Sequence, residues 1–487
     1  MPPQLRSRDG RAVLMQELDI PIFFIRRLGD RQFLVGGGGG SSKTGIPNAV
    51  YLFSLTNRNG RCYLRESQKV DTGAANPMNA SVYEVTSSSL APIVIDPRTR
   101  LPSISHSAGE QPPTRGGRLV VNAVSQMQQA EKEIMRMLST VKELVAVGLD
   151  NTCSVYQISR ALPKQAQPDP GTLIAKDDLL SILYRQSIET VPGKDNIQQC
   201  CAFIPPDPSG NGTPTDPRKK GKDARLVTGG SDGIVRFWTG SDFHIEKSLK
   251  AHDDEITDMD VSCTGDEIIT CGRDHQAHVW NIKTGKLSDS AKPEFPEAKG
   301  VKYRPRKARF DCKDPSVLYV IWIPVIRQRK RQDPSMLCRY RFRKSRLELV
   351  GSVPVKGDSL SALSVSPDGQ YLATGNLDGS VCIIRSDSLS VIYYSDTAHE
   401  TFVTDLEFAD CTFGAKVLTR MDAAQCTLFS VSADRKIMLH QADFHHAKLE
   451  KCRKWVGWSL VIWLIALVFY MVSAVGVFSD ITSSFRG

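Results

Sequence analysis

Short apolar runs, paired in the same way, recur along the chain. Each unit has an apolar strand, a turn rich in glycine and aspartate, and a second apolar or aromatic strand. The clearest units are Arg225 to Trp238 (RLVTGGSDGIVRFW) and Glu267 to Trp280 (EIITCGRDHQAHVW), which begin 42 residues apart. Further copies are Leu144 to Ile158, Tyr371 to Ile384, Leu428 to His440 and, in degenerate form, Val317 to Phe342. A strand-only repeat of this length is typical of the blades of a WD-type β-propeller.

The repeat has a physical reason. A single four-stranded blade buries too little surface to be stable, so blades pack side by side around an axis. His252, Thr270, Asp274 and Trp280 have the residue types that tie such a blade together through hydrogen bonds, and a second Ala-His pair ends at His399. We therefore expect these histidines to be structural rather than catalytic.

A glycine-rich segment interrupts the first strand pair. The apolar runs 33–35 (FLV) and 50–53 (VYLF) have the pattern of two strands, and Gly36 to Asn48 (GGGGGSSKTGIPN) stands where other units have a short turn. Glycine lacks a Cβ, so five in a row let the main chain turn sharply and aim several backbone groups at one point. With this pair the chain has seven hairpins, which predicts an all-β fold, a seven-bladed propeller.

Taken alone, the glycine-rich segment allows two other interpretations. Gly37, Ser42, Lys43 and Thr44 come within one residue of the nucleotide-binding P-loop pattern, but Ser42 stands where the second glycine belongs. A P-loop also opens a helix whose N-terminal amides hold phosphate, whereas this segment leads directly into β-type residues. These departures argue against a P-loop. A hairpin tip without a function stays open at this point.

One long apolar run lies near the C-terminal end. Residues 455–478 comprise 24 positions without a charge, enough to cross the ~30 Å hydrocarbon layer as a helix. Four basic residues within 448–454 precede the run, and only Arg486 follows it. By the positive-inside rule, we expect a cytosolic propeller over residues 1–447, one transmembrane helix and a luminal tail over 479–487. The length and the one-sided basic flank favour this over a buried core helix.

The composition, 41% apolar and 24% charged, is that of a folded domain. The twelve cysteines include no Cys-x-x-Cys pair, which favours reduced thiols over a zinc ribbon or a disulfide framework.

Two segments, Asp96 to Arg118 and Pro205 to Lys222, are rich in proline and glycine, and we expect exposed inserts there. Ser125 to Leu138 has the composition of a short helix. No catalytic triad order, His-Glu-x-x-His motif or acid pair stands out, so we expect no covalent chemistry.

The net charge of +9 is unevenly distributed. Arg218 to Lys222 and Arg327 to Arg346 are the densest basic segments, and they are compatible with a solvated loop, contact with anionic lipid or binding of nucleic acid. In a membrane-anchored chain, the first two interpretations are favoured over the third. No nucleic-acid partner is therefore expected.

The combination of these features resembles a known family. The glycine run followed by residues 43–48 (KTGIPN), on a cytosolic propeller with one C-terminal membrane span, closely resembles the Sec-twelve family of endoplasmic-reticulum (ER) exchange factors. The resemblance extends to residues 229–238, 250–280 and 390–408, and it is weakest over 96–196 and around the basic hairpin at 327–346.

What the resemblance implies is specific. Family members are guanine-nucleotide exchange factors: they promote GDP release and GTP loading on a Sar-type small GTPase, so that the COPII coat assembles for ER-to-Golgi transport. A bound potassium ion holds their glycine-rich loop, which projects to the switch regions of the GTPase. Carried over by position, Ile46, Pro47 and Asn48 contact the GTPase, with Asn48 as the essential side chain. The candidate potassium ligands are the carbonyls of Gly36, Gly37, Gly38, Gly39 and Gly40 and the region of Asn48.

Two other functions stay open beside exchange. A non-catalytic propeller anchored in the ER membrane could assist the export of specific cargo, but it would not need the intact sequence Gly45-Ile46-Pro47-Asn48. A DNA-binding regulator would have to leave the membrane, and the retained apolar run argues against that. ER residence itself follows from the resemblance, because the final residues 485–487 (FRG) are no retrieval signal.

Overall fold

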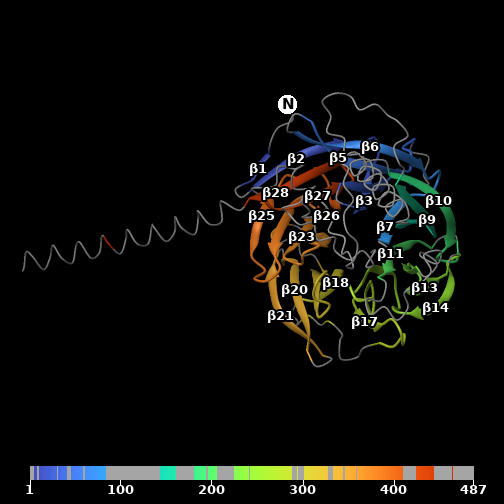
Figure 1. The fold of residues 1–487 in the computed structure, drawn as a ribbon. Helices are drawn as coiled ribbons and strands as arrows, with labels where there is room; N and C mark the ends of the chain where they lie inside the picture. The colour runs from blue at the N-terminus through green and yellow to red at the C-terminus, as the bar shows by residue number, and fades with distance from the viewer. Residues whose placement is uncertain are drawn as a thin grey trace, which may run out of the picture.

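Seven antiparallel sheets form a ring of blades around a central axis (Figure 1). This confirms the prediction of an all-β, seven-bladed propeller. The structure is a computed structural model of the chain. It describes residues 5–7, 10–29, 31–40, 45–58, 61–83, 143–160, 180–193, 196–205, 224–240, 242–287, 293, 295, 301–326, 333–343, 346–357, 359–409, 424–443 and 463.

The first three blades follow one another in chain order. Blade 1 contains β3 (Ile22–Arg27), β4 (Gln32–Gly37), β5 (Ala49–Arg58) and β6 (Arg61–Asp71). Blade 2 contains β7 (Pro77–Tyr83), β8 (Glu143–Leu149), β9 (Thr152–Arg160) and β10 (Leu180–Glu189). Blade 3 contains β11 (Gln198–Ile204), β12 (Arg225–Gly230), β13 (Ile234–Thr239) and β14 (His244–Lys250).

The remaining blades complete the ring. Blade 4 has three described strands, β15 (Ile256–Val261), β16 (Glu267–Gly272) and β17 (Ala277–Asn281). Blade 5 contains β18 (Tyr303–Phe310), β19 (Val317–Pro324), β20 (Met336–Arg343) and β21 (Arg346–Pro354). Blade 6 contains β22 (Leu360–Val365), β23 (Tyr371–Asn376), β24 (Val381–Arg385) and β25 (Val391–Ser395). Blade 7 contains β26 (Val403–Phe408), β27 (Ala424–Ser432) and β28 (Lys436–Asp443), together with β2 (Gly10–Glu17) and β1 (Leu5–Ser7).

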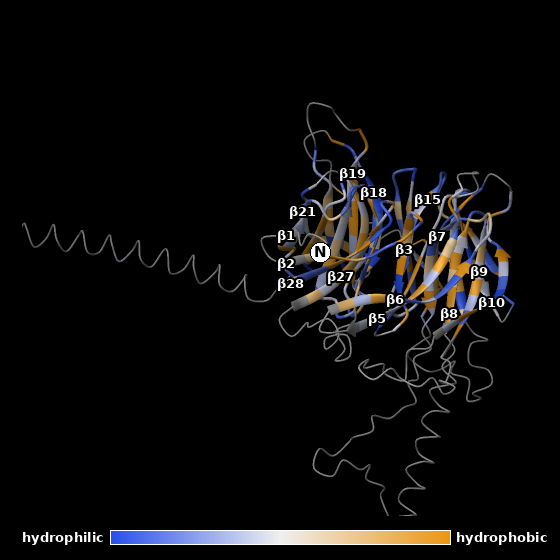
Figure 2. Ribbon diagram, turned by 90° about the horizontal axis from the view of Figure 1, so that it is seen from above, coloured by the Kyte–Doolittle hydropathy of each residue, from blue (hydrophilic) through white to orange (hydrophobic). Residues whose placement is uncertain are grey.

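The position of a strand within its blade explains its sequence. The second strand of a blade is covered on both faces by neighbouring blades, so β4 is buried throughout and β19 over its first seven residues. Both therefore read as continuous apolar runs. The outermost strands β14 and β21 face solvent and are mostly exposed. Figure 2 shows the resulting concentration of apolar residues along the strands.

The ring is closed by pairing between the two ends of the domain. Strand β2, from the N-terminal end, pairs antiparallel with β28, and Val13 lies opposite Leu439 (Figure 1). An apolar cluster then joins blade 7 to blade 1, where the ring centroids of Phe33 and Phe429 are 4.5 Å apart. Without this closure the first and last blades would each expose an apolar face.

The hydrogen-bonded group predicted for blade 4 is present. His252 Nδ1 lies 3.0 Å from Asp274 Oδ1, and His252 Nε2 lies 2.9 Å from Thr270 Oγ1. Trp280 Nε1 donates to Thr270 Oγ1 at 3.0 Å. Burial lowers the pKa of His252, so the ring is held in its neutral, bridging form. This histidine has the structural position that the sequence predicted.

Blade 7 contains a related chain of hydrogen bonds. His399 Nδ1 lies 3.1 Å from Asp434 Oδ1, and its Nε2 lies 2.7 Å from Ser430 Oγ. Ser430 also bonds His440 Nε2 at 2.7 Å, and His440 Nδ1 reaches the hydroxyl of Tyr393 in blade 6 at 2.9 Å. The chain ties blades 6 and 7 together and accounts for His399 as a second structural histidine.

Several predictions concern segments outside the described residues. These are the inserts at 96–118 and, apart from Pro205, at 205–222, the helix over 125–138, the basic tip at 327–332 and the membrane span with its flanks. Of residues 455–478 only Trp463 is described. Within the described part of the chain, no helix combines the length and the hydropathy needed to cross a membrane.

Candidate functional site

The glycine-rich segment connects β4 to β5 in blade 1. Gly36 lies opposite Val50 and Gly37 opposite Ala49, so the first two glycines end one strand and the hairpin opens at Gly38. Beyond the connection the chain continues as strand β5, not as a helix. The segment is therefore a lengthened hairpin turn, as predicted, and lacks the helix of a P-loop.

Close contacts explain why glycine is needed here. A Cβ on Gly37 would lie 1.9 Å from the carbonyl oxygen of Pro21, and one on Gly38 would lie 2.1 Å from Asn48 Oδ1. Gly40 has a φ of 77°, a backbone conformation that residues other than glycine rarely adopt. The glycine run thus lets the end of β4 pack tightly against Pro21, just before β3, and against Asn48.

Asn48 fixes the two ends of the turn to each other. Its side chain accepts a hydrogen bond from the Gly40 amide at 2.9 Å and donates to the Gly40 carbonyl at 3.1 Å. It also donates to the Gly73 carbonyl at 2.9 Å. Asn48 is only 3% exposed, so its described contacts hold the turn from inside.

The remaining predicted contact residues lie at the outer part of the turn. Pro47 and Gly45 are exposed, whereas Ile46 is half-buried and packs against the cluster between blades 7 and 1. Gly45 has φ of 76° and no atom within 4 Å of a built Cβ. Residues 41–44 lie outside the described part. Pro47 is therefore the described contact candidate with the most open position.

The connection from β6 to β7 supports the turn from blade 2. The Thr72 amide donates to the Asn48 carbonyl at 3.0 Å, and the Gly73 amide donates to Asp71 Oδ1 at 2.7 Å. A Cβ on Gly40 would lie 3.8 Å from the side-chain nitrogen Nδ2 of Asn76. Sequence reasoning missed this connection, because its members lie about 25 residues from Asn48 and carry only a Gly/Asn turn signal.

Asp19, Tyr51 and Lys69 form a small polar group near the start of β5. Tyr51 Oη donates to Asp19 Oδ1 at 2.8 Å, and Lys69 Nζ lies 3.7 Å from Asp19 Oδ2 and 4.9 Å from the Tyr51 ring centroid. The hydrogen bond from Tyr51 lowers the pKa of Asp19, so this carboxylate stays charged. The group links the approach to β3 with the two strands β5 and β6.

The ion-binding chemistry available here is that of neutral oxygens. Among the described residues, no group of three or more His, Cys, Asp or Glu could hold a metal ion. The side-chain oxygen of Asn76 is buried and has no hydrogen-bond partner in the described structure, and the side-chain nitrogen of the same residue would lie 3.8 Å from a Cβ built on Gly40. An uncommitted amide oxygen beside main-chain carbonyls fits a weakly hydrated cation such as potassium.

Comparison with known proteins agrees with the fold. The model for "WD domain, G-beta repeat" matches residues 243–281 and 348–385. A guanine nucleotide-exchange factor SEC12 from Rattus norvegicus is 32% identical over 219 residues, which cover 44% of this chain and 51% of that protein. The chain folds as a WD-type propeller and is similar in sequence to SEC12 proteins. SEC12-like protein 2 from Arabidopsis thaliana is 25% identical, with 43% of this chain and 50% of that protein covered.

The chain spans about half the length of the curated relatives it matches. The two matched WD segments contain β14 to β17 and the strands from the end of blade 5 through most of blade 6. They do not include the glycine-rich turn in blade 1. The role of that turn therefore has to be argued from its own contacts.

Proposed function

We propose that this protein is a guanine-nucleotide exchange factor for a Sar-type small GTPase, acting at the ER membrane to start COPII coat assembly and ER-to-Golgi transport. The observation that carries the proposal is the Asn48 bridge. It turns a run of five glycines into a fixed support for Ile46 and Pro47 at the edge of blade 1. The names of the SEC12 relatives add support for the reaction type.

Exchange of this kind needs no covalent chemistry. A small GTPase holds its nucleotide through magnesium, a P-loop and ordered switch segments. A rigid projection that binds the opened form more tightly lowers nucleotide affinity by the difference in its binding energy for the two forms. GDP leaves, and GTP at cellular concentration refills the site. In this arrangement Pro47 and Ile46 contact the GTPase, and Asn48 positions them.

A potassium ion would complete the support of the turn. The carbonyls of Gly38, Gly39 and Gly40, with the side-chain oxygen of Asn76, are the residues we assign to it. Gly36 and Gly37 lie within the ladder between β3 and β5, so they contribute less to the proposed site. When bound, the ion supplies positive charge that orders the carbonyls of a glycine-rich segment, which otherwise loses much entropy on ordering.

The membrane anchor belongs to the same proposal. A single span over 455–478, with the basic segment before it on the cytosolic side, would confine exchange to one membrane. Protease treatment of intact microsomes tests the orientation: the propeller should be degraded, and its protection would contradict a cytosolic domain.

The direct test is nucleotide release. The full chain in detergent is added to a purified Sar-type GTPase loaded with fluorescent GDP. We expect accelerated release that weakens when potassium is replaced by lithium. If a folded chain gives no acceleration at any concentration, exchange is excluded, and a non-catalytic role in cargo export becomes the better explanation.

A further inference from the structure

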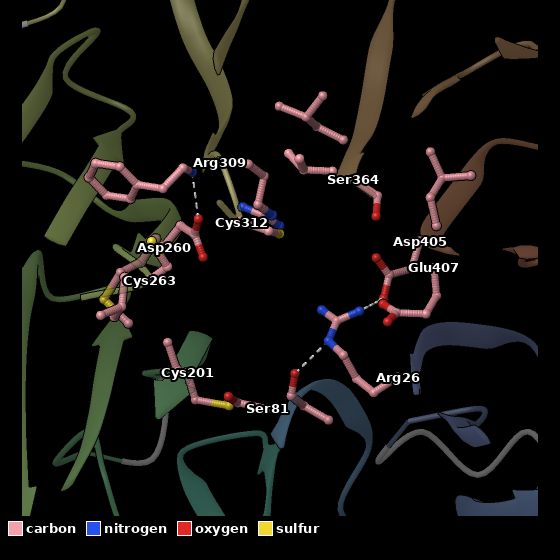
Figure 3. A pocket seen from close by; sticks show the side chains of 18 of the residues that line it. Arg26, Ser81, Cys201, Asp260, Cys263, Arg309, Cys312, Ser364, Asp405 and Glu407 are labelled. Carbon is pink, nitrogen blue, oxygen red and sulfur yellow. Dashed lines mark hydrogen bonds and ion pairs between the residues drawn. The ribbon is translucent and has the colours of Figure 1, made fainter. Parts of the chain in front are cut away.

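A cavity of about 350 Å³ lies on the axis of the ring and is distinct from the glycine-rich turn. The innermost strand of each of the seven blades contributes to its wall: β3, β7, β11, β15, β18, β22 and β26. Figure 3 shows polar side chains converging on it from all sides. The volume falls within the range of small-molecule sites, roughly 300–1,000 Å³.

The two arginines of this axial cavity already have anionic partners. Arg26 in β3 forms an ion pair with Asp405 of blade 7, and its Nε donates to the Ala80 carbonyl at 2.8 Å (Figure 3). Arg309 in β18 forms an ion pair with Asp258 at 2.6 Å. An anionic ligand would have to break one of these pairs. The cavity therefore does not favour anions.

Two carboxylates on opposite walls have no such partner. Asp260 comes from blade 4 and Glu407 from blade 7, three blades apart in a ring of seven. Neither side chain forms an ion pair among the described residues. Asp260 accepts a hydrogen bond from the Phe310 amide at 2.8 Å, and the Arg27 amide bonds Glu407. Each therefore faces the cavity without a counter-ion of its own.

Their pKa values reflect this exposure to a confined, partly desolvated space. Burial raises the pKa of Asp260 to about 6, against the opposing charge of Arg309 and with the like charge of Asp258. Burial raises the pKa of Glu407 to about 7, against Arg26 and Arg27 and with the like charge of Asp405. A cation in the cavity would oppose both shifts, because a nearby positive charge favours the ionised carboxylate.

A third carboxylate of the wall, Asp311, is already bonded by the Lys313 and Asp314 amides and by the Tyr319 hydroxyl, and the remaining polar groups are neutral. The pKa of the Cys201 thiol is raised by its hydrogen bond to Cys153 and by burial, so this thiol is uncharged. Ser364 is 9% exposed, its hydroxyl has no partner in the described structure, and it points into the cavity (Figure 3). This unused hydrogen-bonding group is independent of the carboxylates and also indicates a ligand.

We propose that the axial cavity binds a linear aliphatic diamine, with one ammonium group at Asp260 and the other at Glu407. A dication spanning the cavity would neutralise both carboxylates at once, and its methylene chain would lie along Met259 and Leu406, which also line the wall. The hydroxyl of Ser364 would accept a hydrogen bond from an ammonium group. A ligand on the axis touches every blade and would stabilise the closed ring.

Calorimetric titration of the full chain in detergent tests this, with putrescine as ligand and 1,4-butanediol as its uncharged counterpart. We expect saturable putrescine binding at about pH 8 that is at least about tenfold weaker at about pH 5.5, where both carboxyl groups are mostly protonated. Butanediol should not compete. Equal binding of the diol, absence of putrescine binding, or tighter binding at the lower pH would each overturn the proposal.

The variants Asp260→Asn and Glu407→Gln remove one charge each and keep an oxygen for the amide donors. Each should weaken putrescine binding about tenfold at about pH 8. The matched control is Glu348→Gln, a carboxylate on the outer strand β21, which should bind as the unchanged chain does. Circular dichroism confirms that each variant is folded. If a folded axial variant binds putrescine normally, the site is wrong, whatever the exchange assay shows.

Discussion

Asn48 holds Gly40 through both of its main-chain polar groups, accepting from the amide at 2.9 Å and donating to the carbonyl at 3.1 Å. A side chain thus takes the place that a neighbouring strand would occupy in a sheet. The same Asn48 amide group reaches Gly73 in the next connection, so one buried residue joins the glycine-rich turn to the edge of blade 2. Asn48 can be buried and still be essential for exchange, because it acts by positioning Ile46 and Pro47.

Replacement of Asn48 by alanine should abolish most exchange activity and also reduce stability. The change leaves the polar groups of Gly40 and the Gly73 carbonyl without these partners, at a cost of about 1–3 kcal/mol. Nucleotide release and urea unfolding measure the two effects. Pro47→Ala is the matched control: it removes an exposed contact and should lower exchange with little change in the free energy of unfolding. Equal destabilisation by both variants would contradict the positioning role.

Glycine positions within the turn should differ sharply in their tolerance of alanine. Gly37→Ala places a methyl group 1.9 Å from a backbone oxygen that cannot move aside freely, so we expect strong destabilisation and loss of exchange. Gly45→Ala meets no atom within 4 Å and costs only the strain of its positive φ, about 1 kcal/mol. Thermal unfolding of the two variants compares these effects. A milder effect at Gly37 than at Gly45 would refute the packing described for blade 1.

The hydrogen-bonded group of blade 4 should affect stability without affecting the turn. Thr270→Val keeps the shape but removes the acceptor for Trp280 and the partner of His252. Because two buried polar groups lose their partner, we expect a loss of about 1–3 kcal/mol in the free energy of unfolding. Exchange per folded molecule should be unchanged. A large loss of exchange in a fully folded sample would place blade 4 in the functional surface.

Glu407 should make the protein less stable as the pH rises. Its pKa is raised from 4.5 to about 7 in the folded state, so the folded protein binds the proton more tightly than the unfolded chain. Stability from this group is complete below about pH 4.5 and is lost as the pH rises through about 7. The variant Glu407→Gln removes this dependence. Urea unfolding is measured across this pH range without added amine. The free energy of unfolding of the variant should rise relative to that of the unchanged protein as the pH rises. If the two free energies change with pH in parallel, the raised pKa of Glu407 is excluded.

Much of the fold could be predicted because each strand pair carries a local pattern. The hairpins at β12–β13 and β16–β17 lie within the sequence units RLVTGGSDGIVRFW and EIITCGRDHQAHVW, and the residues of the blade 4 group were recognisable by type and spacing. The hairpin β19–β20 was found although its turn is long and basic. Pairing between strands that are consecutive in the sequence can be predicted from the local sequence alone.

The ring closure could not be predicted in the same way. Strand β2 pairs with β28, more than 400 residues away, and its sequence GRAVLMQE has no paired run beside it to mark it as a blade strand. The pairs Arg26–Asp405 and Arg309–Asp258 escaped notice for the same reason, since both join strands of adjacent blades rather than of one hairpin. The roles predicted for Ile46, Pro47 and Asn48 and for the glycine carbonyls remain predictions, because they rest on the family resemblance.

The sequence by itself determined the blade count, the place of the glycine-rich turn and the structural role of His252, because each depends on residues close along the chain. Only the tertiary structure decided that Asn48 points inward to Gly40 and Gly73, and that Asp260 and Glu407 face one cavity from opposite walls. The physical reason is the ring itself: it brings the inner strand of every blade to one axis and sets each connection beside the next. Side chains from distant parts of the chain therefore share surroundings that no local pattern records.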